Sequence, residues 1–509
     1  MGARPRRRAR HRRLSAVDVL VYGATPAGVA ASVAASRDGA RVALVEPSSH
    51  LGGMLAGGLA RTDVDEQERL IGGLGRELFA RIGRAYGRAI AWRFEPHVAR
   101  EALERWLDEA RVEVALATPL ATVARSGARV VRAAGFEARV FVDASYEGDL
   151  LAAAGVPHVV GRESRTEFAE SLAGRQENAP FAGKQFDVAV SPFAEDGRLL
   201  PLVHGGDPGV PGQGDAKVQA YCYRLCVSTR ADRVPIDAPP GYDPDRFELL
   251  ARYLRVKDGL AFTDIVWPSA LPGECYDLND KGAMSLNHIG ASWEYPHASD
   301  ARRREIAGEH ERYERGLLYF LAHDARVPRR IRDDASRYGL ARAEFAETDH
   351  WPPQLYVREA RRMRGAYVLR QRDLTTDRAK SDGVALAGYN IDSMPVQRIP
   401  IVVQRSPGAF GAVLNEGYLT TRVAAYAIPY RSLVPERADC DNLIVPVCVS
   451  ATHVAYSSLR MEPNYAVLGH AAGVAAALAA RADVAVQDVA VGTLRERLRA
   501  QGAVLDAEG

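Results

Sequence analysis

A glycine-rich turn near the start of the chain has the residue types and the spacing of a phosphate-binding turn. In VLVYGATPAGVAAS, residues 19–32, Gly23 and Gly28 hold the outer positions of a G-x-G-x-x-G pattern, and Thr25 replaces the middle glycine. A helix that starts at Pro26 would point its free N–H groups and the positive end of its dipole at a phosphate. We expect the turn to bind a dinucleotide if the φ angle of Thr25 is negative. The expected contacts are Gly23, Thr25, Pro26, Ala27 and Gly28.

The segments around this turn predict a βαβ unit. Residues 17–22 form a short β-branched run that indicates a strand of a parallel sheet. Residues 26–36 are rich in alanine and predict a helix, and residues 41–45 predict a second strand. Glu46 and Pro47 follow that strand about 20 residues after the turn, where an acid accepts hydrogen bonds from ribose hydroxyls. Without further motifs, an α/β turn that binds no nucleotide explains this pattern equally well.

Two glycine pairs directly after Glu46 favour FAD over NAD. They lie in HLGGMLAGGLARTD, residues 50–63, and paired glycines let a chain lie flat along a diphosphate or a flavin ring. A domain that binds NAD alone has no need of this segment. A flexible loop is the alternative, but it fits poorly because leucine and methionine are interleaved as buried residues would be. The expected contacts are Gly52, Gly53, Met54, Gly57 and Gly58.

Two further segments carry clustered polar residues. THVAYSSLRME, residues 452–462, places histidine, tyrosine, serine and arginine side chains just before a predicted alanine-rich helix. In HWPPQLYVREARRMRGAYVLRQRD, residues 350–373, Glu359 and Arg362 have the i,i+3 spacing of an ordinary pair on a helix face. That pairing is the alternative to a catalytic role for them, and a buried histidine with satisfied hydrogen bonds is the alternative for His453.

Several motifs together resemble one protein family. They are FEPHVA at 94–99, FVDASYEGDLLAAAGV at 141–156, GRES at 161–164, QAYCYRLC at 219–226, YNIDSMPVQR at 389–398 and VCVSATHVAYSSLRMEPNY from 447. They are similar to FAD-dependent oxidoreductases grouped with the flavoprotein subunit of heterodisulfide reductase, and more distantly to the flavoproteins of fumarate reductase and succinate dehydrogenase. The resemblance runs from Val17 to about Ala480. It implies an α/β fold with a Rossmann-like FAD-binding domain of the glutathione-reductase type.

The resemblance to fumarate reductases implies a proton relay. In those enzymes a Glu-x-x-Arg segment feeds a later arginine that donates the proton and is followed by aspartate. Glu359 and Arg362 match the first pair, and Arg372 with Asp373 matches the second in type but follows sooner along the chain. His350 matches a substrate-binding histidine ahead of the relay.

The same resemblance implies a substrate site before the last long helix. His453 and Arg460 resemble a histidine and an arginine that hold a substrate carboxylate in fumarate reductases. The residues that follow would meet the edge of the flavin ring. These are Met461, Glu462, Pro463 and Asn464.

Three details limit what the resemblance implies. Met394 follows the IDS segment where the family usually has histidine, so a proton-transfer role of that histidine is not carried over. His50 lies near the flavin-linked histidine of succinate dehydrogenase, but the spacing differs by one residue, and we expect non-covalent FAD. Cys222 and Cys226 lack the four-cysteine spacing of an iron–sulfur motif, so we expect structural cysteines and no metal site.

The order of these motifs predicts a discontinuous FAD-binding domain. It would comprise residues 16–165 and 405–509, with an inserted α+β substrate or capping domain at 166–404. Asp143 ends a predicted strand and would face the cofactor, because ligands bind beyond the carboxyl ends of such strands. Residues 1–15 are strongly basic and predict a disordered extension.

Composition argues against several other classes. The 509 residues carry a formal net charge of +2, which does not favour nucleic acid or a membrane surface as a partner. The sequence has no stretch that approaches the ~20 apolar residues of a membrane span. The five cysteines have no regular spacing, which fits a reducing cytoplasm. We expect a cytoplasmic protein whose partner is a small molecule.

These patterns predict an FAD-dependent oxidoreductase that acts on a small polar substrate by hydride transfer at flavin N5. Two alternatives remain at this point: a flavin-dependent monooxygenase with an external reductant, and an FAD-binding protein without turnover. The sequence does not identify the substrate or the external electron donor or acceptor.

Overall fold

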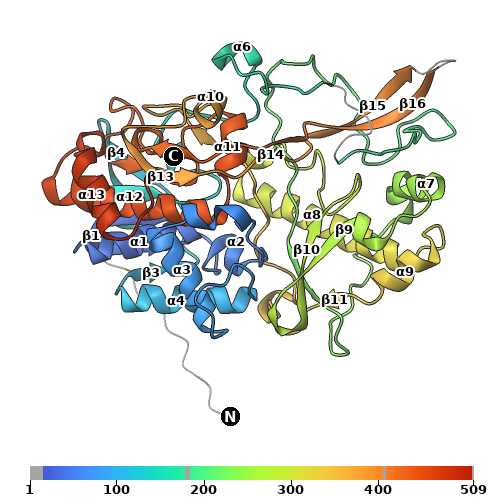
Figure 1. The fold of residues 1–509 in the computed structure, drawn as a ribbon, viewed down its shortest axis with the longest axis horizontal. Coiled ribbons are helices and arrows are strands. Elements are labelled where there is room, and N and C mark those ends of the chain that lie inside the picture. The colour runs from blue at the N-terminus through green and yellow to red at the C-terminus, as the bar shows by residue number, and fades with distance from the viewer. Residues whose placement is uncertain (1–14, 178–183, 405–408, 507–509) are drawn as a thin grey trace.

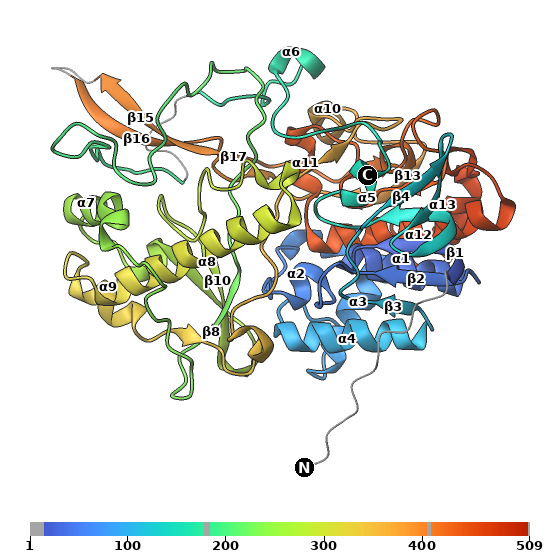
Figure 2. The ribbon, with the colours of Figure 1, turned by 180° about the vertical axis from the view of Figure 1, so that it is seen from behind.

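The computed structural model describes residues 15–177, 184–404 and 409–506. Figure 1 shows a part built from both ends of the chain, in blue and red, beside a part built from its middle, in green and yellow. Figure 2 shows the same arrangement from behind, with α8 crossing the middle part. The basic extension predicted at residues 1–15 lies outside the described residues, except that Ser15 begins the first strand.

The first part is built on a mostly parallel sheet in the order β3-β2-β1-β6-β5-β4, with β19 also paired to β6. Its strands are β1 (Ser15–Tyr22), β2 (Val42–Val45), β3 (Glu113–Ala115), β4 (Val123–Ser126), β5 (Arg129–Ala133), β6 (Phe136–Asp143) and β19 (Leu443–Ile444). β1 pairs in parallel with β2 and with β6. The predicted βαβ unit is confirmed, and the fold is a mixed α/β fold of the Rossmann type.

Helices from both ends of the chain pack on this sheet and on each other. They are α1 (Pro26–Arg37), α2 (Gly53–Ala56), α3 (Gly73–Arg84), α4 (Pro96–Glu109), α5 (Asp149–Ala153), α12 (Glu462–Ala482) and α13 (Val491–Ala500). A Cβ atom on Gly469 or Gly473 of α12 would overlap the carbonyl oxygens of Ala27 and Ala31 in α1. The two helices are therefore in backbone contact. The helix α12 is long and apolar enough to span a membrane, but 83% of its apolar 18-residue window is buried inside the protein.

The middle of the chain forms a second sheet in the order β11-β8-β10-β9, in which neighbouring strands are antiparallel. The strands of this sheet are β8 (Leu225–Ser228), β9 (Val266–Ala270), β10 (Cys275–Asp280) and β11 (Gly339–Leu340). The helices α7 (Glu248–Val256), α8 (Asp300–His323) and α9 (Arg329–Ala335) belong to the same part of the chain. The first turns of α8 reach the other part, because Arg303 donates two hydrogen bonds, of 2.7 and 2.9 Å, to Asp149 of α5.

Short antiparallel pairs complete the structure. β7 (His158–Val159) pairs with β12 (Arg362–Met363), β13 (Gly383–Ala387) with β18 (Tyr426–Pro429), β14 (Ile391–Ser393) with β17 (Leu419–Thr421), and β15 (Gln397–Gln404) with β16 (Ala409–Glu416). The remaining helices are α6 (Arg165–Phe168), α10 (Gln371–Thr375) and α11 (His453–Leu459). β15 and β16 thus pair across the domain boundary predicted at residue 405.

The backbone contact between α1 and α12 makes a testable prediction. Gly473→Ala places a methyl group against the Ala31 carbonyl, and we expect it to lower the free energy of unfolding by about 1–3 kcal/mol. Gly492→Ala in α13 is the matched control, because a Cβ there meets open space. Thermal unfolding followed by circular dichroism measures both. Equal melting temperatures for the two variants would contradict the close packing.

Candidate functional site

The glycine turn has the backbone geometry that the sequence requires. Thr25 has a φ of −69°, so a side chain is tolerated where the middle glycine is usual. Its Oγ1 donates to the Ala144 carbonyl at 2.8 Å and accepts from the Gly28 N–H at 3.3 Å. Gly23 has a φ of +97°, and a Cβ on it would lie 2.6 Å from the Ser145 nitrogen. The predicted negative φ of Thr25 is therefore confirmed, and α1 starts at Pro26 as predicted.

Glu46 lies beside this turn at the end of β2. Its Oε2 accepts from the Ala24 N–H at 2.8 Å, and its Oε1 accepts from the Ser48 N–H at 2.9 Å. Burial raises the pKa of Glu46, and these two hydrogen bonds oppose that rise. Because a carboxylate has about four acceptor positions, two bonds leave capacity for ribose hydroxyls.

A cavity of about 260 Å³ joins the turn to the middle part of the chain. From the first part it is lined by Gly23, Thr25, Glu46, Pro47, Ser48, His50, Gly53, Ser145, Tyr146 and Glu147. From the middle part it is lined by Tyr223, Tyr295, Arg303, Arg304, Ala307, Pro353, Gln354 and Leu355. A glycine-containing turn at a helix N-terminus, an acid and two arginines around one cavity fit a nucleotide diphosphate.

The arginines of this cavity were missed in the sequence. Arg303 is held by Asp149, whereas Arg304 is exposed and, among the described residues, has no carboxylate within salt-bridge distance. Glu147 accepts a hydrogen bond from the Tyr295 hydroxyl at 3.1 Å, and burial raises the pKa of Glu147 to about 7. The run of three arginines at 302–304 was an available signal, but arginine is too common in this chain to single it out.

The glycine pairs after Glu46 are needed partly for internal packing. A Cβ on Gly53 would lie 2.5 Å from the Tyr146 hydroxyl, and Gly53 also lines the cavity. A Cβ on Gly57 would meet the Gln354 side chain, and one on Gly58 would meet the Arg224 carbonyl. The second pair therefore lets this loop touch the middle of the chain, a role that the sequence alone did not indicate.

Tyr146 connects the loop to the first turn of α12. Its hydroxyl oxygen accepts from the Met54 N–H at 2.9 Å, and the hydroxyl donates to Glu462 Oε1 at 2.8 Å. Glu462 is buried, its Oε2 has no hydrogen-bond partner among the described residues, and burial raises the pKa of Glu462 to about 8. A buried oxygen without a partner at the N-terminus of a long helix fits a hydrogen bond to a bound cofactor.

The other predicted cofactor residues near these have internal partners. Asp143 is buried, and its oxygens accept from Ser145 and from the Leu151 N–H, so it shapes the loop and does not line the cavity. Met461 is the N-cap of α12, followed by Pro463 in its first turn. Asn464 donates to the Leu459 carbonyl at 3.3 Å.

Glu359, Arg362 and His453 come together in one buried cluster. His453 Nδ1 lies 2.8 Å from Glu359 Oε2, and Arg362 Nε lies 3.2 Å from Glu359 Oε1. Gln219 donates to the same Glu359 Oε2 at 2.9 Å, and Glu163 lies 3.1 Å from Arg362. Glu359 and Arg362 are paired, but residue 359 is not helical and Arg362 begins β12, so the alternative of an ordinary pair on a helix face is wrong.

Charge determines the ionisation of this cluster. Burial alone would raise the pKa of Glu359, but the charges of His453 and Arg362 and the hydrogen bonds from His453 and Gln219 lower it to about 2. Glu359 is therefore a carboxylate at neutral pH. Such a carboxylate fixes the orientation of the His453 ring through Nδ1 and leaves Nε2 for another partner.

Arg460 forms a second buried cluster with residues that the sequence did not single out. Its Nη2 lies 3.2 Å from Asp392 Oδ2, and its Nη1 donates to the Tyr356 hydroxyl at 3.2 Å. Its Nε is buried without a hydrogen-bond partner among the described residues. The two clusters are linked, because Gln219 bonds both Glu359 and the Met394 N–H, two residues after Asp392.

His350 and Arg372 do not join these clusters. His350 Nδ1 contacts the Glu344 carbonyl at 2.9 Å, in a turn where φ of His350 is +62°. Arg372 is exposed on α10, whereas its neighbour Asp373 is buried and accepts from the Tyr367 hydroxyl. Arg372 is exposed and, among the described residues, contacts neither Glu359 nor His453, so the structure does not support its assignment as proton donor. The spacing between Arg362 and Arg372 is shorter than in fumarate reductases, and this difference in the sequence already argued against the assignment.

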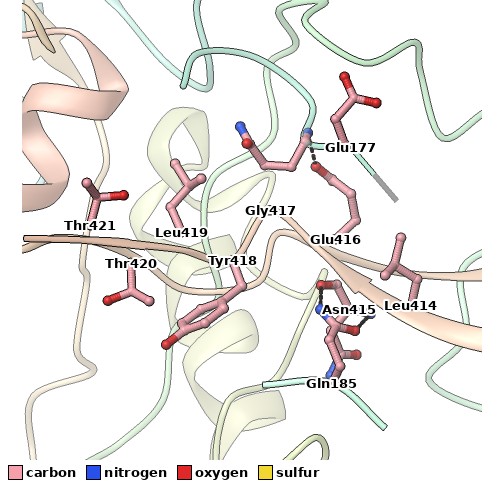
Figure 3. A pocket seen from close by; sticks show the side chains of 11 residues that line it. Glu177, Gln185, Leu414, Asn415, Glu416, Gly417, Tyr418, Leu419, Thr420 and Thr421 are labelled. Atoms are coloured by element: carbon pink, nitrogen blue, oxygen red, sulfur yellow. Dashed lines mark hydrogen bonds between the residues drawn. The ribbon is translucent and has the colours of Figure 1, made fainter. Parts of the chain in front are cut away.

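A second cavity of about 300 Å³ lies where β16 leads into β17, as Figure 3 shows. Its amide side chains are already bonded: Gln185 donates to the Asn415 carbonyl and accepts from the Asn415 N–H. Glu416 accepts from Arg162 and from the Gln176 N–H. These side chains of the cavity wall already have hydrogen-bond partners within the protein. We therefore propose no reaction at this cavity.

All five cysteines are buried and free. The Arg358 guanidinium donates a hydrogen bond to Cys222 Sγ at 3.2 Å. Burial raises the pKa of the Cys222 thiol to about 12. His50 lines the cofactor cavity and is half-buried, and burial lowers its pKa.

The FAD dependent oxidoreductase family model matches residues 18–498, so the chain belongs to that family and is an FAD-dependent oxidoreductase. No curated protein matches the chain. Among solved structures it is similar over short stretches to a geranylgeranyl bacteriochlorophyll reductase-like protein from Thermoplasma acidophilum, with 18% identity over 28% of this chain and 43% of that chain and a TM-score of 0.21.

Two further solved structures give comparable values. An anhydrotetracycline hydroxylase from Streptomyces rimosus has 16% identity over 30% of this chain and 38% of that chain, with a TM-score of 0.19. A flavin-dependent brominase has 19% identity over 29% of this chain and 42% of that chain, with a TM-score of 0.21. The match spans less than half of each of these three chains.

The raised pKa of Glu462 predicts how stability depends on pH. Glu462 stays neutral in the folded protein up to about pH 8, whereas an unfolded glutamate ionises near pH ~4.3. Between these values the free energy of unfolding falls by about 1.4 kcal/mol per pH unit, because the unfolded state loses the proton first. Glu462→Gln removes this loss. In the cofactor-free protein, the melting temperature of the variant relative to wild type should therefore rise from pH 5 to pH 8. If the melting temperatures of wild type and variant changed with pH in parallel, Glu462 would not be neutral in the folded protein.

Proposed function

We propose that this FAD-dependent oxidoreductase transfers a hydride between a small polar substrate and non-covalently bound FAD. The observation that carries the proposal is the cavity shared by the glycine turn, Glu46 and the first turns of α8. FAD, when bound, exchanges the hydride at its N5 atom. The residues of this chain bind the cofactor, orient the substrate and hold protons.

Cofactor binding is assigned to four groups. The N-terminus of α1 offers backbone N–H groups to the diphosphate, and Glu46 accepts from the ribose hydroxyls. Arg304 supplies a positive charge from the opposite wall of the cavity. Glu462, with its unpaired Oε2, donates a hydrogen bond as a neutral acid.

Substrate binding and proton transfer are assigned to α11 and its C-cap. His453 is the first residue of α11 and Arg460 its C-cap, so the two lie seven residues, about two helical turns, apart on the same side. Glu359 holds the proton on His453 Nδ1, which leaves Nε2 to exchange a proton with the substrate. The unpaired Nε of Arg460 donates to an anionic or polar group of the substrate.

We further propose that residues 166–404 act as a substrate or capping domain and that the chain groups with heterodisulfide reductase flavoproteins. The separate four-stranded sheet of the middle segment supports the first point. The motifs from 141 to 164 and from 447 onward support the second. The proposed partner is a small molecule, and the proposed compartment is a reducing cytoplasm.

A change in cofactor affinity tests the binding assignment. Arg304→Gln should weaken FAD binding about tenfold, which is about 1.4 kcal/mol, because a charge that faces the diphosphate is lost. Arg302→Gln is the matched control, since Arg302 pairs with Glu294 and Glu305 on the surface and does not line the cavity. Quenching of FAD fluorescence gives both dissociation constants. Equal FAD dissociation constants for the two variants would show that α8 does not contribute to cofactor binding.

The rate of flavin reduction tests the proton-transfer assignment. His453→Asn should keep FAD bound but slow flavin reduction by about 10²-fold, the scale of losing a positioned acid or base. His323→Gln, at the exposed end of α8, should leave the rate unchanged. A panel of acids, sugars and amines is first screened for anaerobic reduction of the flavin. A wild-type rate in the His453 variant would contradict the assignment.

A further inference from the structure

A separate cavity of about 460 Å³ lies between α8 and the short 3₁₀ helix η2 (Pro244–Phe247). None of its lining residues lines the cofactor cavity. Its lining residues are Pro201, Pro239, Pro240, Gly241, Tyr242, Asp243, Arg246, Phe247, Arg312 and Gly316. Its volume lies within the ~300–1,000 Å³ typical of small-molecule sites.

Arg246 is a half-buried cation in this cavity without a carboxylate partner. Its guanidinium lies 3.2 Å from His288 Nε2 and 5.7 Å from the centre of the Tyr313 ring. Among the described residues, no carboxylate lies within salt-bridge distance of it. Burial lowers the pKa of Arg246 and the charge of Arg312 adds to that effect, whereas Tyr313, Glu309 and Asp243 oppose it. Two guanidinium groups therefore face one cavity and repel each other.

The acidic and imidazole groups around Arg246 do not neutralise it directly. Asp243 lines the cavity, but its Oδ1 accepts from the Asp245 N–H. Glu309 lies one turn before Arg312 on α8 and is 3.8 Å from Arg302. Burial lowers the pKa of His288 well below its usual range, so this imidazole is neutral and adds no charge. Of the charged residues that line the cavity, two are arginines and one is an aspartate, which leaves one positive charge in excess.

The remaining walls are flat and apolar. The rings of Tyr242 and Phe247 are stacked, with centroids 6.5 Å apart and planes 27° apart. Three prolines add rigid apolar surface, and Gly316 lets the Phe247 and Tyr242 rings pack against α8, since a Cβ on Gly316 would lie 3.2 Å from the Phe247 ring. An aromatic or saturated ring fits against such walls, whereas the arginines fit its anionic group.

We propose that this cavity is a second small-molecule site that binds a ring-bearing organic carboxylate. The carboxylate lies between Arg246 and Arg312, and the ring lies against Tyr242 and the neighbouring prolines. Binding supplies the counter-charge that Arg246 lacks. The site shares α8 with the cofactor cavity, since Arg304 and Arg312 are eight residues, or about 12 Å, apart along that helix.

Benzoate is the probe, and isothermal titration of the FAD-loaded protein is the measurement. Wild type should bind one benzoate per chain, and Arg246→Gln should weaken binding at least tenfold. Arg312→Gln should also weaken it, and it tests the site even if the first variant does not fold, because Arg312 is exposed. Arg330→Gln, an exposed arginine of α9 that does not line the cavity, is the control with the same change in charge and should bind as wild type does.

Three results would overturn the proposal. The proposed site is wrong if benzoate does not bind wild type, or if it binds both cavity variants as tightly as it binds wild type. Inorganic phosphate or benzyl alcohol that binds as tightly as benzoate removes the ligand class, because the first lacks the ring and the second lacks the charge. A change in the flavin absorbance spectrum on adding benzoate places the ligand at the flavin instead. An unchanged spectrum together with the loss in both variants supports the separate site.

Discussion

The contact between the glycine turn and the end of β6 is the constraint on which the site depends. Gly23 lies against the backbone of residues 144 and 145, and the Thr25 hydroxyl bonds the Ala144 carbonyl. A side chain at position 23 would push these two strand ends apart. Because α12 is in backbone contact with α1, the same turn also fixes where Glu462 begins the last long helix. Gly23, Thr25 and Ser145 line the cavity proposed for the cofactor.

The sequence predicted the local parts of this arrangement well. The β1–α1–β2 unit, the substitution of Thr25 and the position of Glu46 follow from residues close together in the chain, and the structure has them as predicted. The pairing of Glu359 with Arg362 follows from their spacing, but the contact of Glu359 with His453, 94 positions away, was not predicted, and the helix expected as the alternative for residues 359–362 is absent. Motifs that fold locally are readable because their geometry does not depend on distant residues.

The rest depended on contacts between residues far apart in the sequence. Arg304 faces the glycine turn only because α8 crosses from the middle part of the chain, and Tyr146 meets Glu462 across 316 positions. Gly58 approaches the Arg224 carbonyl for the same reason. Arg372 illustrates the opposite error: its type matched a motif, but α10 turns it to the surface. No pattern of spacing contains this information.

We propose that the turn, Glu46 and α8 together bind the nucleotide half of FAD. Titration of the cofactor-free protein with FAD, FMN and NAD, followed by flavin fluorescence and calorimetry, tests it most directly. We expect one FAD per chain, bound about 100-fold more tightly than FMN, a difference of about 2.7 kcal/mol, because FMN lacks the adenosine and the second phosphate. NAD, which lacks the flavin, should bind more weakly than FAD. Equal affinity for FMN and FAD, or no binding of either flavin, would contradict it.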